Sequence, residues 1–91
     1  MLYVLICEDK ADSLALRQSV RSQHLQYIDD FDVRFAGPML AEDHETMVGS
    51  IIFLEADDLA GAQAFAASDP YGVAGLFEQV TIRPFKQVVP S

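Results

Sequence analysis

Residues 1–7, "MLYVLIC", decide the fold, because they form an unbroken apolar run that ends at Glu8 and Asp9. A short apolar run of aromatic and β-branched residues predicts a β-strand inside a sheet. Side chains alternate between the two faces of a strand. Both faces of this strand are therefore apolar, with Leu2, Val4 and Ile6 on one and Tyr3, Leu5 and Cys7 on the other.

Another predicted strand, residues 49–56, repeats this two-sided pattern, because Ile51 and Phe53 oppose Ile52 and Leu54. A sheet with helices on one face only would leave several of these side chains in water. Burying each of them is worth about 1.5–3 kcal/mol. The sequence therefore predicts a homodimer in which two open sheet faces pack together.

Two helices and two further strands follow from periodicity and from residues that break regular structure. The first helix is capped by Asp12 or Ser13 and runs to about residue 30. The second helix spans residues 58–68, has Asp57 as its N-cap and ends before Pro70. The other predicted segments are a strand at 32–37 that Gly37–Pro38 ends, a polar loop at 39–48, a turn at 71–76, and a strand at 77–85 in which Pro84 indicates a sheet edge or a strand end.

The predicted order of elements is βαββαβ. This order is typical of the ferredoxin-like α+β fold, a four-stranded antiparallel sheet with two helices on one face. The chain has 91 residues, which is the size of one domain, so residues 1–91 are expected to form a single domain.

Composition excludes several functions. The net charge of −8 argues against nucleic acid or an anionic membrane surface as the main partner, because both select basic proteins. Cys7 is the only cysteine, so an internal disulfide or a cysteine-based zinc cluster cannot form. The run "EDHE" at residues 42–45 is at most a loose metal site, so we expect neither metal nor cofactor. The apolar N-terminus has no basic start and is too short to span a membrane, which favours a cytoplasmic protein.

The first helix contains a histidine where a leucine is expected. Helical periodicity places His24 at the centre of the apolar face of "RQSVRSQHLQYI", residues 17–28, with Arg17 in line with it and Arg21 on its flank. One interpretation is a core histidine with backbone partners, the two arginines reaching the rim. The other is an acid/base group in a partly dry pocket, with a carboxylate beside it.

Asp69 is the acidic residue in the most apolar surroundings, between "FAAS" and "YGVAGLF". A structural role would be to cap the next helical turn, with Pro70 at the first helical position. A functional role is equally compatible with an acid among apolar residues.

Several stretches together resemble the YciI-like, or YCII-related, family of small bacterial proteins. They are the opening "LYVLICED", "RQSVRSQHLQYI", "FAGPM" and "ASDPYGVAGLFEQVTIRPF". The resemblance implies a dimeric ferredoxin-like α/β barrel related to muconolactone isomerase. It also implies an active site built on the histidine of "R-x-x-H", here His24, and the aspartate of "D-P-Y", here Asp69. Arg21 is the motif arginine, Arg17 stands at a commonly basic position, and Gly37–Pro38 matches the family's turn.

The sequence and its family resemblance predict a small cofactor-independent enzyme of the isomerase or lyase kind. His24 would move a proton on a small anionic, cyclic or enolisable substrate, and Asp69 would orient the imidazole. The substrate-binding residues would be Arg17, Arg21, Gly37, Pro38 and Tyr71. Two alternatives stay open: a dimer that binds or senses a small ligand in the same pocket, and a structural dimer within a larger complex.

Overall fold

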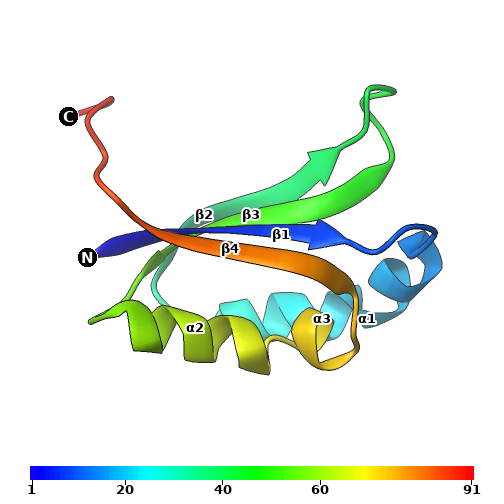
Figure 1. Ribbon diagram of the computed structural model, residues 1–91, viewed down its shortest axis with the longest axis horizontal. Helices are drawn as coiled ribbons and strands as arrows, with labels where there is room; N and C mark the ends of the chain where they lie inside the picture. The colour runs from blue at the N-terminus through cyan, green and yellow to red at the C-terminus, as the bar shows by residue number, and fades with distance from the viewer.

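In the computed structural model, which describes residues 1–91, four strands form one antiparallel sheet in the order β2-β3-β1-β4. The strands are β1 Leu2–Asp9, β2 Val33–Leu40, β3 Met47–Glu55 and β4 Phe77–Phe85. The helices are α1 Leu14–Ile28, α2 Leu59–Ser68 and the single turn α3 Pro70–Val73, and all lie on one face of the sheet (Figure 1). The predicted ferredoxin-like α+β fold is confirmed.

The hydrophobic core lies between the helices and the sheet. The inner strands β1 and β3 supply most of it, because their apolar side chains on that face are almost fully buried. The core residues are Tyr3, Leu5, Cys7, Ile52 and Leu54 from the sheet and Ala62 and Phe65 from α2. Alternation along the strands therefore divides the two faces as the sequence predicted.

The predicted bounds of the loop at residues 39–48 are wrong at both ends. Strand β2 continues through Gly37 and Pro38 to Leu40, and β3 already begins at Met47. Proline lacks the N–H that a central strand needs, but β2 is an edge strand, where one side of the backbone has no partner strand. The breaker signal of Gly37–Pro38 therefore does not end the strand.

The helix ends also differ from the prediction. The N-cap of α2 is Asp58 rather than Asp57, because the Asp58 carboxylate accepts a 2.8 Å hydrogen bond from the backbone N–H of Gly61. Helix α1 starts after Ser13, as one of the two predicted caps allows, and ends at Ile28, short of residue 30. No helix in the chain is long and apolar enough to cross a membrane.

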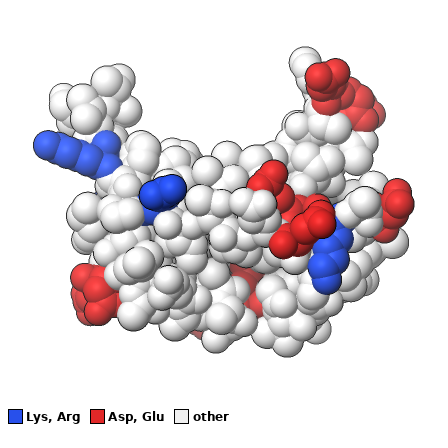
Figure 2. All heavy atoms as spheres, viewed as in Figure 1, with Lys and Arg blue, Asp and Glu red and all other residues white.

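The sheet face away from the helices is hollow and largely uncharged. In Figure 1 the β2–β3 hairpin and the C-terminal tail both rise on this side, at opposite ends of the sheet. Figure 2 shows acidic side chains at the hairpin and basic ones on the side of the tail, with mostly uncharged atoms between them. The half-buried apolar side chains of the two inner strands on this face are Leu2, Val4, Ile6, Ile51 and Phe53.

Candidate functional site

His24 and Asp69 are 45 positions apart in the chain, and their side chains are in contact on the helix side of the sheet. The imidazole Nδ1 lies 2.8 Å from Asp69 Oδ1 and 3.0 Å from Oδ2, and both residues are buried. Because the oxygens of a carboxylate are hydrogen-bond acceptors, this geometry favours the tautomer in which Nδ1 carries the proton and donates it to Asp69. In the neutral ring Nε2 then has a free lone pair. This nitrogen has no hydrogen-bond partner in the chain, yet it is not one of the fully occluded polar atoms.

Asp69 also caps α3. Its Oδ1 accepts a 2.9 Å hydrogen bond from the backbone N–H of Tyr71, and Pro70 occupies the first helical position. Pro70 disfavours helical geometry at the residue before it, and Asp69 accordingly has an extended backbone with ψ of 130°. The helix cap therefore fixes the carboxylate that faces His24, and the two roles that the sequence left open are geometrically compatible.

The ring of Tyr71 contacts both the imidazole of His24 and a guanidinium group. Its ring stacks on His24 with centroids 4.0 Å apart and planes 16° from parallel, and Arg17 Cζ lies 4.7 Å from the ring centroid. Arg17 and His24 lie about 10 Å apart along α1, and both side chains contact the Tyr71 ring. Burial raises the pKa of Tyr71, although the charges of Arg17 and Arg21 partly oppose this. The phenol is neutral at physiological pH.

Arg17 is buried rather than at the rim. It donates to Asp9 through Nε at 2.7 Å and through Nη2 at 3.0 Å, and Nη2 also donates to Ser50 Oγ at 2.8 Å. Burial alone would lower the pKa of Arg17, but the hydrogen bonds and charge of Asp9, with smaller contributions from Tyr71, together raise that pKa. The sequence reasoning missed Asp9 and Ser50. The only signal for Ser50 was a hydroxyl at an inward position of an otherwise apolar strand.

A pocket of about 70 Å³ opens beside the imidazole, between α1, β2 and β3. Six of the seven predicted site residues line this pocket. The seventh, Asp69, does not line it but contacts His24. Arg21 is exposed at this pocket and makes no ion pair within the chain. The polar and aromatic lining residues are Arg17, Arg21, His24, Ser50 and Tyr71, and the others are Leu25, Ile28, Ala36, Gly37, Pro38, Met47 and Ile52.

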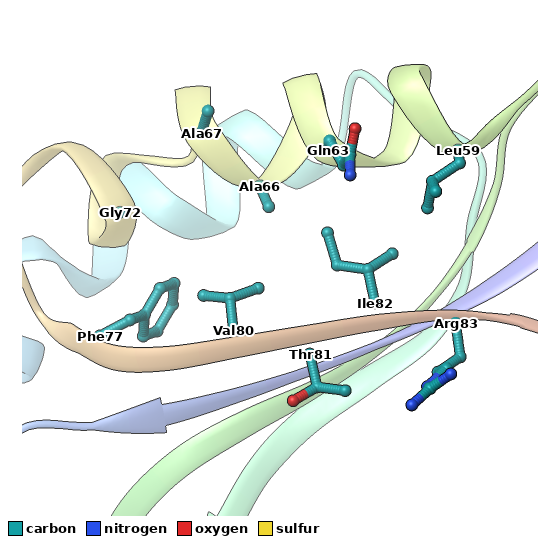
Figure 3. Close-up of a pocket in the computed structure, with 10 residues that line it drawn as sticks. All are labelled: Leu59, Gln63, Ala66, Ala67, Gly72, Phe77, Val80, Thr81, Ile82 and Arg83. Carbon is teal, nitrogen blue, oxygen red and sulfur yellow. The ribbon is translucent and has the colours of Figure 1, made fainter.

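A larger hollow of about 670 Å³ lies between α2 and β4. In Figure 3 Ile82, Val80 and Phe77 point from the strand toward the helix, and Thr81 and Arg83 lie on the other side of the strand. The only ionisable residue in its lining is Arg83. It offers no group that could take up or release a proton near neutral pH, so the smaller pocket is the candidate site.

The remaining cysteine and histidine lie apart from this chemistry. Burial raises the pKa of Cys7 to about 12, with smaller effects from Asp69 and Asp9, so the group is a neutral thiol at physiological pH. His44 is exposed in the β2–β3 hairpin. No three His, Cys, Asp or Glu side chains come close enough together to hold a metal ion.

Fold and site together define a ferredoxin-like α+β protein with a buried histidine–aspartate pair at a pocket between helix and sheet. The chain belongs to the YCII-related domain family, whose sequence profile matches residues 1–86. It is 43% identical to the protein YciI of Escherichia coli O6:H1, over 97% of this chain and 99% of that protein.

Two solved structures place the fold among known proteins. The chain is similar to 5-chloro-2-hydroxyhydroquinone dehydrochlorinase, TftG, of Burkholderia phenoliruptrix in its complex with 2,5-dihydroxybenzoquinone. The two share 28% identity and a TM-score of 0.89, with 97% of this chain and 96% of the other covered. A NIPSNAP domain protein of Burkholderia xenovorans shares the fold alone, at 14% identity and a TM-score of 0.57, over 100% of this chain and 98% of that one.

Proposed function

We propose that this protein is an enzyme that uses His24 and Asp69 for acid/base chemistry on a small anionic compound. The observation that carries the proposal is a buried imidazole whose Nδ1 lies 2.8 Å from the Asp69 carboxylate and whose Nε2 has no hydrogen-bond partner in the chain. A base needs a free lone pair, and the opposite nitrogen must be held so that the ring cannot change tautomer. The buried carboxylate also stabilises the imidazolium that forms when Nε2 takes up a proton.

The pocket walls favour a ligand that carries negative charge. Arg21 offers an unpaired guanidinium that can contact a carboxylate or an enolate through two parallel hydrogen bonds. The pocket volume of about 70 Å³ is well below the ~300–1,000 Å³ of pockets that enclose drug-sized ligands. We therefore infer that the reacting edge of a small ring enters it and the rest of the ligand stays outside.

The likeness to TftG suggests the reaction. That protein is a dehydrochlorinase, and its structure holds a dihydroxyquinone. We propose that this chain likewise acts on hydroxylated or chlorinated six-membered rings, by elimination or isomerisation. Loss of HCl needs a base for the proton and an exit for chloride, and His24 Nε2 supplies the base. Neither step calls on a cofactor.

The test is whether the protein turns over 5-chloro-2-hydroxyhydroquinone, and the reaction is measured by the release of chloride. General acid–base catalysis is worth about 10²–10⁴-fold, so His24→Gln should lower kcat by about that factor. Gln23→Ala changes the exposed neighbour on the same helix and should keep the wild-type rate. Full turnover by His24→Gln would refute the mechanism. Tight binding of 2,5-dihydroxybenzoquinone with no chloride release by the wild-type chain would favour a ligand-binding or sensing role.

We also propose that the protein is a homodimer through its open sheet face. Apolar side chains on this face include Phe53, which packs against Phe35 and Phe85 at centroid distances of 4.6 and 4.9 Å. The two ends of the face carry opposite charges (Figure 2). A second copy turned end for end would set its basic end over the acidic hairpin of the first. The exposed acids at the hairpin are Glu42, Asp43 and Glu45. The exposed bases at the other end are Arg83 and Lys86, together with Arg34, which already pairs with Asp32 and Glu55.

Light scattering after size-exclusion chromatography tests the dimer. We expect a mass of two chains at micromolar concentration, and one chain for Phe53→Lys, which puts a charge into the centre of the interface. Val73→Lys is the matched control, because Val73 is 74% exposed on α3, on the helix side. A wild-type monomer at micromolar concentration would contradict the proposal.

A further inference from the structure

Met47 is the one residue that lines both the pocket at His24 and a second hollow beside it. The second hollow holds about 280 Å³ and is lined by residues 9–14, between β1 and α1, and by residues 46–48, at the base of the β2–β3 hairpin. The two hollows are therefore neighbours along β3, and the Met47 side chain lies at their boundary.

A β-bulge turns Met47 toward this boundary. The pairing of β3 with β2 jumps from Gly49 to Met47 between two consecutive β2 residues, so β3 carries one extra residue here. Alternation along a regular strand would put the side chains of residues 47 and 50 on opposite faces. The bulge shifts the alternation by one, and Met47 lines the same pocket as Ser50. Bulges are frequent beside functional sites, where they re-aim a side chain.

The boundary between the two hollows has a fixed part and a movable part. Arg17 lines the first hollow and Asp9 lines the second, and the two hydrogen bonds that join them hold both side chains in place. The Met47 side chain is half-buried, makes no hydrogen bond, and is free to turn about several bonds. The position of Met47 therefore decides whether the two hollows are joined.

The joined space has room for more than the edge of a ring. The pocket at His24 holds about 70 Å³, but together with the second hollow it reaches the ~300–1,000 Å³ of pockets that enclose a ligand. The one buried carboxylate of the second hollow is paired, and its exposed charges, Lys10 and Asp12, are opposite in sign. Its apolar residues Leu14 and Val48 are 37% and 42% exposed. This lining favours an uncharged, apolar group.

We propose that Met47 is a specificity-determining residue, and that the substrates are hydroxylated six-membered rings that carry a short, uncharged alkyl side chain. This inference rests on the proposed function and narrows its substrate class. The reacting edge of the ring lies at His24, and the alkyl group extends past Met47 into the second hollow. Contact with Leu14 and Val48 there removes apolar surface from water and adds to binding.

Calorimetry tests this by comparing the affinities of 2,5-dihydroxybenzoquinone and of its 3-propyl derivative. Each CH₂ group that becomes buried raises affinity about 4-fold. Partial burial of the propyl group should therefore make the derivative bind at least about 10-fold more tightly to the wild type. The ratio of the two affinities is compared between proteins, so that any effect of a variant on binding of the ring itself cancels.

Two variants of Met47 change the boundary in opposite directions. Met47→Trp fills it with a larger, stiffer side chain and should lower the affinity ratio to about 1. Met47→Ala opens it and should improve binding of the branched 3-tert-butyl derivative about 10-fold relative to the propyl derivative. Met39→Ala is the matched control, because Met39 is a half-buried methionine on the adjacent strand that lines neither hollow. It should keep the wild-type ratios.

The outcomes separate this inference from the proposed function. A wild-type ratio near 1, with 2,5-dihydroxybenzoquinone still bound, would overturn the inference and leave His24 as the base. Wild-type ratios retained by both Met47 variants would overturn the role of Met47. The expected ratios without chloride release from 5-chloro-2-hydroxyhydroquinone would support the role of Met47 and refute the proposed reaction. A wild-type chain that binds neither quinone would overturn both.

Discussion

Replacement of Asp69 by alanine should destabilise the fold far more than the loss of an ordinary surface carboxylate. Asp69 is 1% exposed and serves two donors, the imidazole Nδ1–H of His24 and the backbone N–H of Tyr71. Each buried donor left without a partner costs about 1–3 kcal/mol. We expect a loss of about 3 kcal/mol in the free energy of unfolding, because the imidazole can change tautomer and relieve part of the cost. For a domain of this size that lowers Tm by roughly 12–24 °C.

Thermal unfolding followed by circular dichroism at pH 7 measures this, with every variant at one chain concentration because association shifts Tm. Asp57→Ala is the matched control: Asp57 is exposed, makes no side-chain hydrogen bond and should lie within about 0.5 kcal/mol of wild type. Asp69→Asn keeps one acceptor oxygen and should fall between the two. If the Tm of Asp69→Ala equals that of Asp57→Ala, the Asp69 carboxylate does not stabilise the contact between α1 and α3.

Three further predictions concern the buried Arg17–Asp9 pair, the thiol of Cys7 and the carboxylate of Asp43. Arg17→Met should lower the free energy of unfolding by about 3–5 kcal/mol, because it leaves the Asp9 carboxylate, whose side chain is 5% exposed, without its cation. Arg34→Met is the control, because it breaks an exposed ion pair worth under ~1 kcal/mol. Denaturant unfolding measures both variants. Cys7, with a pKa of about 12, should not react with a thiol reagent at pH 8 until the chain is unfolded, and rapid labelling of folded protein would contradict its burial. Hydrogen bonds to Thr46 and the backbone lower the pKa of Asp43 to about 2. The ionised Asp43 carboxylate therefore stabilises the hairpin fully above about pH 4, and this stabilisation should be lost as the pH falls toward 2. The amide NMR shifts of the hairpin would report this, and a midpoint near the ordinary pKa of an aspartate would contradict it.

The sheet was predictable because both faces of its inner strands are apolar, a pattern that few other structures satisfy. The errors occur where tertiary context overrides a local signal. Pro38 is a strand breaker in isolation, yet at the edge of this sheet its missing N–H costs nothing. Asp57 and Asp58 are equally good caps by type, and only the direction of the chain entering α2 selects Asp58.

The site was partly predictable for a similar reason. Periodicity located His24, and the proline after Asp69 marked that residue, but their 2.8 Å contact depends on how α1 and α3 pack. The bond network of Arg17 with Asp9 and Ser50 joins three separate elements, so no local pattern in the sequence indicates it. The relation to muconolactone isomerase and the second subunit of a dimer stay predictions.

The tautomer of His24 tests the central claim most directly, because the proposed chemistry needs a protonated Nδ1 and a bare Nε2. Long-range ¹H–¹⁵N correlation NMR of the neutral ring distinguishes the two nitrogens, and Asp69→Asn identifies the effect of the carboxylate. We predict that Nδ1 carries the proton in the free protein, and that added 2,5-dihydroxybenzoquinone shifts mainly the Nε2 resonance. A neutral ring protonated at Nε2, unaffected by that ligand, would contradict the account.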